Sequence, residues 1–213
     1  MYPVIYFGYF KFKIIEPIGN NMPEQKTADN LLCSAGNSCL LIIDIQSRLT
    51  AVMPGKVLER LKRNTSLLLK AANLLSVSVF ATQQYPNGLG TMEADIQAVL
   101  PKNYHHFDKT CFSCTDASGF MDALAATGKH QVVITGIEAH ICVLQTAIKL
   151  HTAGYDVFVV GDAVSSRQRE NYENAIQRLQ GCGVTVCNTE SVLFEWLRDA
   201  KHEHFKTLSA LVR

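Results

Sequence analysis

Three side chains that could carry out acyl-transfer chemistry lie at expected strand ends, and the first of them is Asp44. Asp44 directly follows an apolar run over residues 40–43, which is typical of a strand buried on both faces. A carboxylate at the rim of such a strand needs a partner, because burying its charge alone is costly. A loop or helix-capping role is the alternative for this segment.

The second of these side chains is Cys142, which lies in the first turn of a helix predicted over about residues 140–152. A strand over 132–135 and a turn at Gly136 precede it. N–H groups at a helix N-terminus favour negative charge, so the thiol pKa there can fall below about 8.5, and the same groups can bind an oxyanion. Alternatively, Cys142 is a buried apolar residue, as free cysteines often are.

The third is Lys109, at the end of a strand predicted over residues 104–109. A lysine beside a carboxylate and a thiol favours the thiolate and orients the carboxylate. An exposed surface lysine is the alternative.

Four side chains near the ends of the first two strands are candidates for binding a substrate: Gln46, Gln83, Gln84 and Tyr85. The glutamine amides could donate to and accept from a small polar ligand. Stabilisation of their own loops is the alternative.

The spacing Cys111-x-x-Cys114 raises the question of a metal or redox site. A structural zinc site generally needs a second ligand pair, and Cys182 and Cys187 are four residues apart. A thioredoxin-like redox role stays open, because the motif follows a predicted strand.

The elements that must position these residues alternate between β-branched runs and helical periodicity. Strands are predicted at 39–44, 77–82, 104–109, 132–135, 156–160 and 184–187, and helices at 57–75, 118–126, 140–152, 168–180, 191–197 and 203–212. The alternation predicts an α/β fold of three layers (α/β/α), doubly wound around a mostly parallel six-stranded sheet.

The 213 residues fit one domain, which we place at residues 22–213. Residues 1–21, rich in aromatic side chains and followed by Met22, are interpreted as an N-terminal extension, with an added hairpin or partner-binding arm as the alternative.

A net charge of +1 gives no field for nucleic acid or a membrane surface. Seven cysteines without a disulfide-scaffold pattern favour a reducing, cytoplasmic setting.

Asp44, Lys109 and the segment from Gly136 to Val143 together resemble the isochorismatase-like cysteine hydrolases, over about residues 38–200. The resemblance implies that Cys142 is the nucleophile, that Asp44 takes the thiol proton and that Lys109 completes the triad. It also implies neighbouring first and fourth strands and a cis peptide bond after Ile137. The backbone N–H groups of Glu138 and Cys142 would then form an oxyanion hole.

The resemblance further implies a homo-oligomer and a small-molecule substrate with an amide, imide or related carbon–nitrogen bond. Nicotinamidases of this superfamily carry Asp and His metal ligands after the first strand, whereas residues 45–94 here contain neither type, and His105 and His106 come too late. We therefore expect neither metal nor cofactor. A redox-responsive binding protein on the same fold is the alternative function, and the sequence leaves the substrate open.

Overall fold

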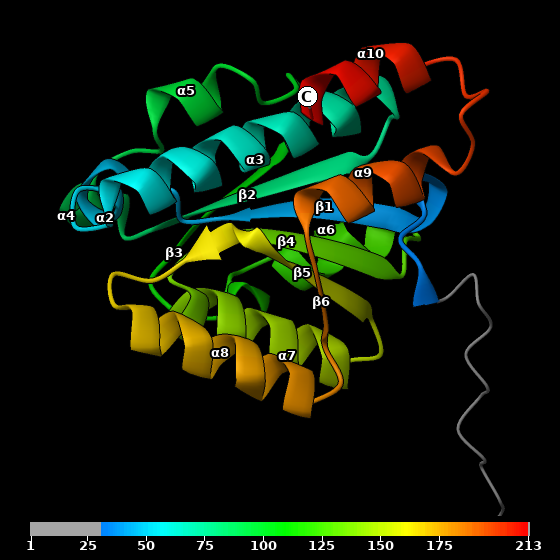
Figure 1. Cartoon of the computed structure of the whole chain (residues 1–213). Coiled ribbons are helices and arrows are strands. Elements are labelled where there is room, and N and C mark those ends of the chain that lie inside the picture. The colour runs from blue at the N-terminus through cyan, green and yellow to red at the C-terminus, as the bar shows by residue number, and fades with distance from the viewer. Residues whose placement is uncertain (1–30, 213) are drawn as a thin grey trace, which may run out of the picture.

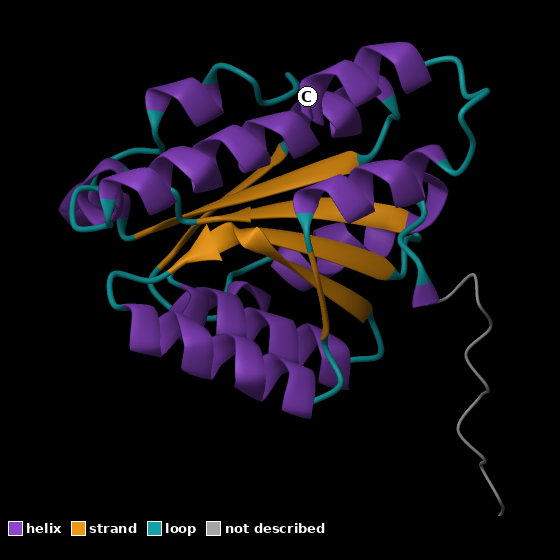
Figure 2. Ribbon diagram, viewed as in Figure 1, coloured by secondary structure: helices purple, strands orange, loops and turns teal. Residues whose placement is uncertain are grey.

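A parallel six-stranded sheet forms the middle layer of the structure, a computed structural model that describes residues 31–212 (Figure 2). The expected extension over residues 1–21 lies outside the described residues. The strands are β1 (Ser38–Ile43), β2 (Ser78–Gln84), β3 (His105–Lys109), β4 (Gln131–Ile137), β5 (Asp156–Ser165) and β6 (Thr185–Cys187). All neighbouring strands are parallel, so the predicted fold class is confirmed and the sheet is wholly parallel.

The strand order is β3-β2-β1-β4-β5-β6, which places β1 between β2 and β4. The chain therefore winds outward first on one side of β1 and then on the other. Ligands of such sheets bind at the carboxyl ends of the strands, beside the point where the order reverses. This point lies between β1 and β4, as the sequence implied.

Helices cover both faces of the sheet (Figures 1 and 2). One face carries α3 (Gly55–Leu74), α9 (Thr189–Leu197) and α10 (Phe205–Ser209), and the other carries α6 (Phe120–Ala126), α7 (Leu144–Thr152) and α8 (Arg169–Gly181). Side chains of β1 alternate between the two cores: Leu40 and Ile42 pack on the first face, and Leu41 and Ile43 on the second. The sheet is thus buried on both sides.

Short helical segments in the connections were not predicted from the sequence. They are α2 (Ser47–Thr50), α4 (Pro86–Leu89), α5 (Ala94–Gln97) and the 3₁₀ segments Ala35–Asn37 and Cys114–Asp116. The helix predicted over 140–152 begins instead with a π-helical turn over Ala139–Val143, and the one predicted over 203–212 ends with the 3₁₀ segment Ala210–Val212. β5 also continues to Ser165, five residues beyond the predicted end, through an irregularity in its pairing with β4. A period of 3.6 residues cannot be recognised in segments of one turn, which explains why the sequence missed them.

Gly136 lets β4 approach β1 closely at the carboxyl edge. Its φ is +122°, and a Cβ atom there would lie 2.0 Å from the carbonyl oxygen of Ile43. Only glycine fits this position without moving one of the two strands. The residue thus sets the spacing between the segments that carry Asp44 and Cys142.

None of the helices in the described part of the chain is both long and apolar enough to cross a membrane.

Candidate active site

Asp44 is the first residue after β1, and its side chain is fully buried. Its φ of 50° lies in the left-handed region, which aspartate tolerates better than most residues. The turn directs the carboxylate toward the neighbouring strand β2, where Oδ1 accepts a hydrogen bond of 2.7 Å from Thr82 Oγ1. Oδ2 lies 2.6 Å from the ammonium nitrogen of Lys109. The carboxylate is therefore held at both oxygens.

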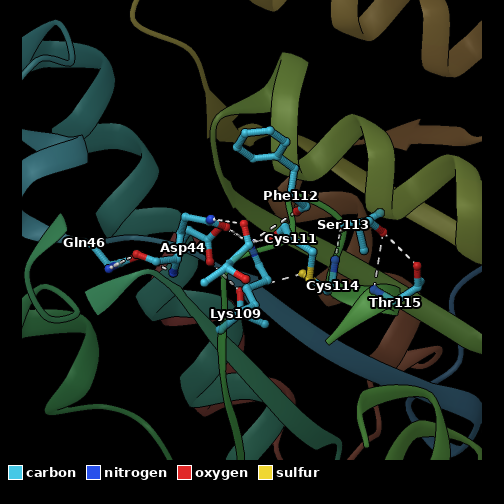
Figure 3. A network of polar contacts seen from close by, with 12 residues as sticks. Asp44, Gln46, Lys109, Cys111, Phe112, Ser113, Cys114 and Thr115 are labelled. Atoms are coloured by element: carbon cyan, nitrogen blue, oxygen red, sulfur yellow. Dashed lines mark hydrogen bonds and ion pairs between the residues drawn. The ribbon is translucent and has the colours of Figure 1, made fainter. Parts of the chain in front are cut away.

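Lys109 lies at the end of β3 with its side chain completely buried. Besides Asp44, its Nζ donates to Gln84 Oε1 at 2.7 Å and to the backbone carbonyls of Phe112 at 3.2 Å and Cys111 at 3.4 Å (Figure 3). Burial, the largest single cause, lowers the pKa of Lys109, but the charge of Asp44, the neighbouring thiols Cys114 and Cys142 and the hydrogen bond to Asp44 together outweigh it, so the pKa is raised. Lys109 therefore stays charged, and its ammonium group pairs with the Asp44 carboxylate.

Cys142 lies in the π-helical turn that follows β4, and only 5% of it is exposed. The negative charge of Asp44 and the positive charge of Lys109 both act on its thiol. Burial and then the negative charge of Asp44 raise the pKa of Cys142, and the opposing effect of Lys109 is smaller. The expectation of a thiol pKa below the ordinary value is wrong, because the helix terminus and lysine do not outweigh burial and the carboxylate.

Cys114 is a second buried thiol behind the same carboxylate. Its Sγ donates to Thr82 Oγ1 at 3.8 Å, and its backbone N–H donates to Thr146 Oγ1 at 2.9 Å. Burial raises the pKa of Cys114 to about 12. Cys111 is half-buried, and both thiols are free. Within residues 31–212, no three His, Cys, Asp or Glu side chains gather as a metal site would require.

The loop from β4 into the π-helical turn begins with a cis peptide bond between Ile137 and Glu138, at the position that the resemblance implies. The Glu138 carboxylate accepts a hydrogen bond of 3.0 Å from the backbone N–H of Arg167 and lies 3.7 Å from its guanidinium. His140 Nδ1 lies 2.9 Å from Ser166 Oγ. These contacts fix the backbone of the turn against the end of β5.

A cavity of about 90 Å³ opens onto Cys142. Its lining is mainly apolar and comes from the ends of several elements: Leu49, Gln84, Leu89, Phe112, Glu138, Ile141 and Cys142. The thiol is thus reached through an apolar space, and the charged pair of Asp44 and Lys109 lies beneath it, out of contact with solvent.

The four candidate substrate-binding residues are not brought together. Gln84 lines the cavity, but its side chain is occupied by Lys109 and by the carbonyl of Thr110. Gln46 is fully buried, and its amide bonds the backbone of Gln84 and Gly90. Gln46 therefore stabilises the loop.

The other two candidates lie outside the cavity over Cys142. Gln83 points to the opposite side of β2, where it bonds Asp108 and the N–H of Met92 and lines a separate hollow. Tyr85 is 55% exposed, and its ring lies against Gly88. Side chains alternate along a strand, so adjacent glutamines could not both face the same site.

Sequence reasoning missed Thr82 and the apolar lining. Thr82 is the last residue of the predicted second strand, so a search of strand ends for hydroxyl groups beside Asp44 would have included it. The lining residues Leu49, Leu89, Phe112 and Ile141 lie in short or irregular segments, and no pattern in the sequence marks them.

Comparisons with known proteins agree with the geometry. Residues 38–191 match the model of the isochorismatase domain. Isochorismatase family protein 1A of Dictyostelium discoideum is 34% identical over 192 residues, which cover 88% of this chain and 90% of the relative. The structure of MAR1 ribonuclease from Caenorhabditis elegans has a TM-score of 0.80 and 31% identity, covering 85% of this chain and 92% of that one. The YcaC gene product of Escherichia coli, described as an octameric hydrolase of unknown specificity, has a TM-score of 0.78 and 23% identity, covering 85% and 89%.

Proposed function

Because the chain belongs to the isochorismatase family of enzymes, we propose that it is a cysteine hydrolase of small amides, imides or related carbon–nitrogen substrates, working through a covalent acyl-enzyme without metal. The observation that carries the proposal is the buried ion pair of Asp44 and Lys109, whose charges both act on the thiol of Cys142. A nucleophile, a proton acceptor and a fixed cation are thereby close together in one buried site.

In the proposed reaction, Cys142 Sγ attacks the substrate carbonyl carbon while Asp44 takes the thiol proton. The Glu138 and Cys142 N–H groups stabilise the oxyanion. When the carbon–nitrogen bond breaks, Asp44 returns the proton to the leaving nitrogen, and the acyl group stays on sulfur. Water then attacks the acyl carbon, Asp44 accepts its proton, and the thiol is regenerated with release of the acid.

The raised thiol pKa supports a particular timing of the proton transfer. Cys142 is neutral before substrate binds, so the proton moves to Asp44 as the carbon–sulfur bond forms. Lys109 keeps the carboxylate in place throughout, because its ammonium group contacts Asp44 Oδ2 directly.

Turnover of an amide and imide panel, read by nitrogen release and by intact mass of the trapped acyl-enzyme, tests the proposal. We expect Cys142→Ala to lower kcat by at least about 10⁴-fold, since nucleophile removal leaves only binding and oxyanion effects. Cys182→Ala, which removes an exposed thiol, is the matched control and should leave turnover unchanged. Undiminished turnover in Cys142→Ala contradicts the mechanism.

Two further arms separate the proposal from other chemistry. Activity that is lost to EDTA and restored by Zn²⁺ contradicts the metal-free mechanism. RNA joins the panel because the C. elegans neighbour is named a ribonuclease. Cleavage of RNA that depends on Cys142, without amide turnover, would replace the proposed substrate class.

We also propose that the chain forms a homo-oligomer in a reducing, cytoplasmic setting. The support is the octameric description of the E. coli neighbour, and the seven cysteines, all of which are free. Light scattering of the purified chain tests the first part, and a monomer at all concentrations contradicts it.

A further inference from the structure

The described lining of the cavity over Cys142 contains no cation that could neutralise an anionic substrate. Among the described residues that line it, none is a lysine, arginine or histidine. Lys109 lies beneath the cavity, but its side chain has no exposed surface and already contacts four oxygen atoms. Glu138 is the one ionisable carboxylate in the lining, and Arg167 holds it.

The size of the cavity limits what can reach the thiol. A dry cavity of about 150 Å³ accommodates benzene in an engineered protein core, whereas the volume here is about 90 Å³. Four apolar side chains, Leu49, Leu89, Phe112 and Ile141, form most of the wall. The space beside the thiol therefore suits an aliphatic group of roughly two to four carbon atoms better than an aromatic ring, the rest of which would extend toward solvent.

We infer that the substrates are short, uncharged aliphatic acyl compounds whose acyl chain fills this apolar cavity, with the reacting carbonyl against Cys142 Sγ. The inference rests on the proposed function, because it takes the same cavity as the substrate site. A carboxylate on the acyl chain would lose its hydration in the cavity without gaining a cation, beside the negative charge of Asp44. Anionic substrates and ring amides are thereby disfavoured.

Alkylation tests the charge preference without requiring turnover. Iodoacetamide and iodoacetate have nearly the same shape, but only iodoacetate is anionic. We expect Cys142 to react at least ~100-fold faster with iodoacetamide, after division by the same ratio at exposed Cys182, because a hundredfold corresponds to a modest desolvation cost. Peptide mapping by mass spectrometry measures both thiols in one sample. Equal normalised rates overturn the inference.

A variant that adds a positive charge to the cavity wall sharpens this test. Leu89→Lys places a cation in the cavity wall and should raise the normalised iodoacetate rate at Cys142 at least ~10-fold, because the ion gains a partner. Leu74→Lys, at the exposed far end of α3, is the matched control and should leave the ratio unchanged. If Leu89→Lys also leaves it unchanged, the cavity does not govern access to the thiol.

A substrate panel separates failure of this inference from failure of the proposed function. We expect kcat/KM to be highest for propionamide and butyramide, and at least ~100-fold lower for succinamate and benzamide. Phe112→Ala should widen the cavity and raise the rate for benzamide relative to propionamide. Faster hydrolysis of the anionic or ring amides by a Cys142-dependent route overturns the inference while the hydrolase stands. Absence of any Cys142-dependent hydrolysis overturns both.

Discussion

Asp44 interacts with each of the other polar groups at the centre of the site. It accepts a hydrogen bond from Thr82, pairs with the ammonium of Lys109 and acts through its charge on the thiol of Cys142, so one carboxylate links three strands and the turn after β4. Its negative charge also adds to the effect of burial in raising the thiol pKa, which favours the protonated form of Cys142 at rest. In the proposed mechanism the same residue favours the protonated thiol at rest and accepts its proton during attack.

Asp44→Asn should have two opposite effects on Cys142. We expect kcat to fall by at least about 10³-fold, because the proton acceptor is lost. The pKa of Cys142 should fall at the same time, since the carboxylate that raises it is removed while Lys109 remains. The pH dependence of iodoacetamide labelling at Cys142 measures the second effect.

Asp116→Asn provides the control for that variant. Asp116 forms an exposed ion pair with Lys149, so the variant Asp116→Asn should leave both turnover and labelling unchanged. A Cys142 pKa that stays the same or rises in Asp44→Asn would contradict the assigned cause of the shift.

Thr82 is a positioning residue for Asp44. Thr82→Val keeps the shape of the side chain but removes the 2.7 Å hydrogen bond to Oδ1, so unfolding free energy should fall by about 1–3 kcal/mol. We expect kcat to fall about tenfold with KM little changed, because the carboxylate is less well oriented. Thr82→Ser keeps the hydroxyl and should restore kcat. If serine fails to restore it, the hydroxyl is not the group that matters.

At the scale of elements, the contact between β1 and β4 positions the reacting groups. Asp44 follows β1 and Cys142 follows β4, and Gly136 lies opposite Ile43 in the register of the two strands. Because a side chain at residue 136 would overlap the backbone of β1, the distance between the two strand ends depends on this glycine.

Gly136→Ala should therefore damage both stability and the site. We expect a loss of about 3 kcal/mol or more in unfolding free energy, from backbone overlap and an unfavourable φ. Gly128→Ala also has a positive φ, of +64°, but its Cβ would meet open space, so its cost should be only about 1–2 kcal/mol. Urea denaturation compares the two variants, and equal losses would mean that overlap with β1 contributes nothing.

Long periodic elements were predictable, whereas the site wall was not. All six strands and α3, α6, α7, α8 and α9 were predicted, and apart from the longer β5 they lie close to their predicted ranges, because alternation and 3.6-residue periods survive over many residues. The positions of Asp44, Lys109 and Cys142 at carboxyl strand ends followed from the same pattern. The direction of each glutamine and the apolar lining depend on single turns such as α2 and α4, for which the sequence has no periodic signal.

At the scale of the whole molecule, five buried or partly buried thiols link folding to pH. Burial is the main cause that raises the pKa of each of them: Cys33, Cys39, Cys114, Cys142 and Cys187. A thiol is neutral when protonated, so the folded state keeps these protons at pH values where the unfolded chain has lost them. Unfolding then releases protons, and stability falls as pH rises above about 8.5.

We expect the unfolding free energy to decline between pH 8.5 and 10.5, with each such thiol contributing up to about 1.4 kcal/mol per pH unit. The pKa of Cys187 is raised to about 12 in the folded chain. Cys187→Ala should therefore make the decline less steep by the contribution of one thiol, up to about 1.4 kcal/mol per pH unit. Fluorescence of buried Trp196 during urea unfolding provides the measurement. Cys182→Ala removes an exposed thiol and should leave the slope unchanged, and a slope equal to wild type in Cys187→Ala contradicts the linkage.

The central place of β1 has a consequence for the timing of synthesis. β1 and β2 leave the ribosome early, but the other edge of β1 is covered only when residues 131–137 have been made. At ordinary rates of elongation this delay is roughly 5–20 seconds. Throughout it the nascent chain presents a mainly apolar strand with a bare hydrogen-bonding edge, the kind of surface on which chains associate wrongly. The strand that anchors Asp44 is thus also the segment for which an emerging chain most needs a chaperone.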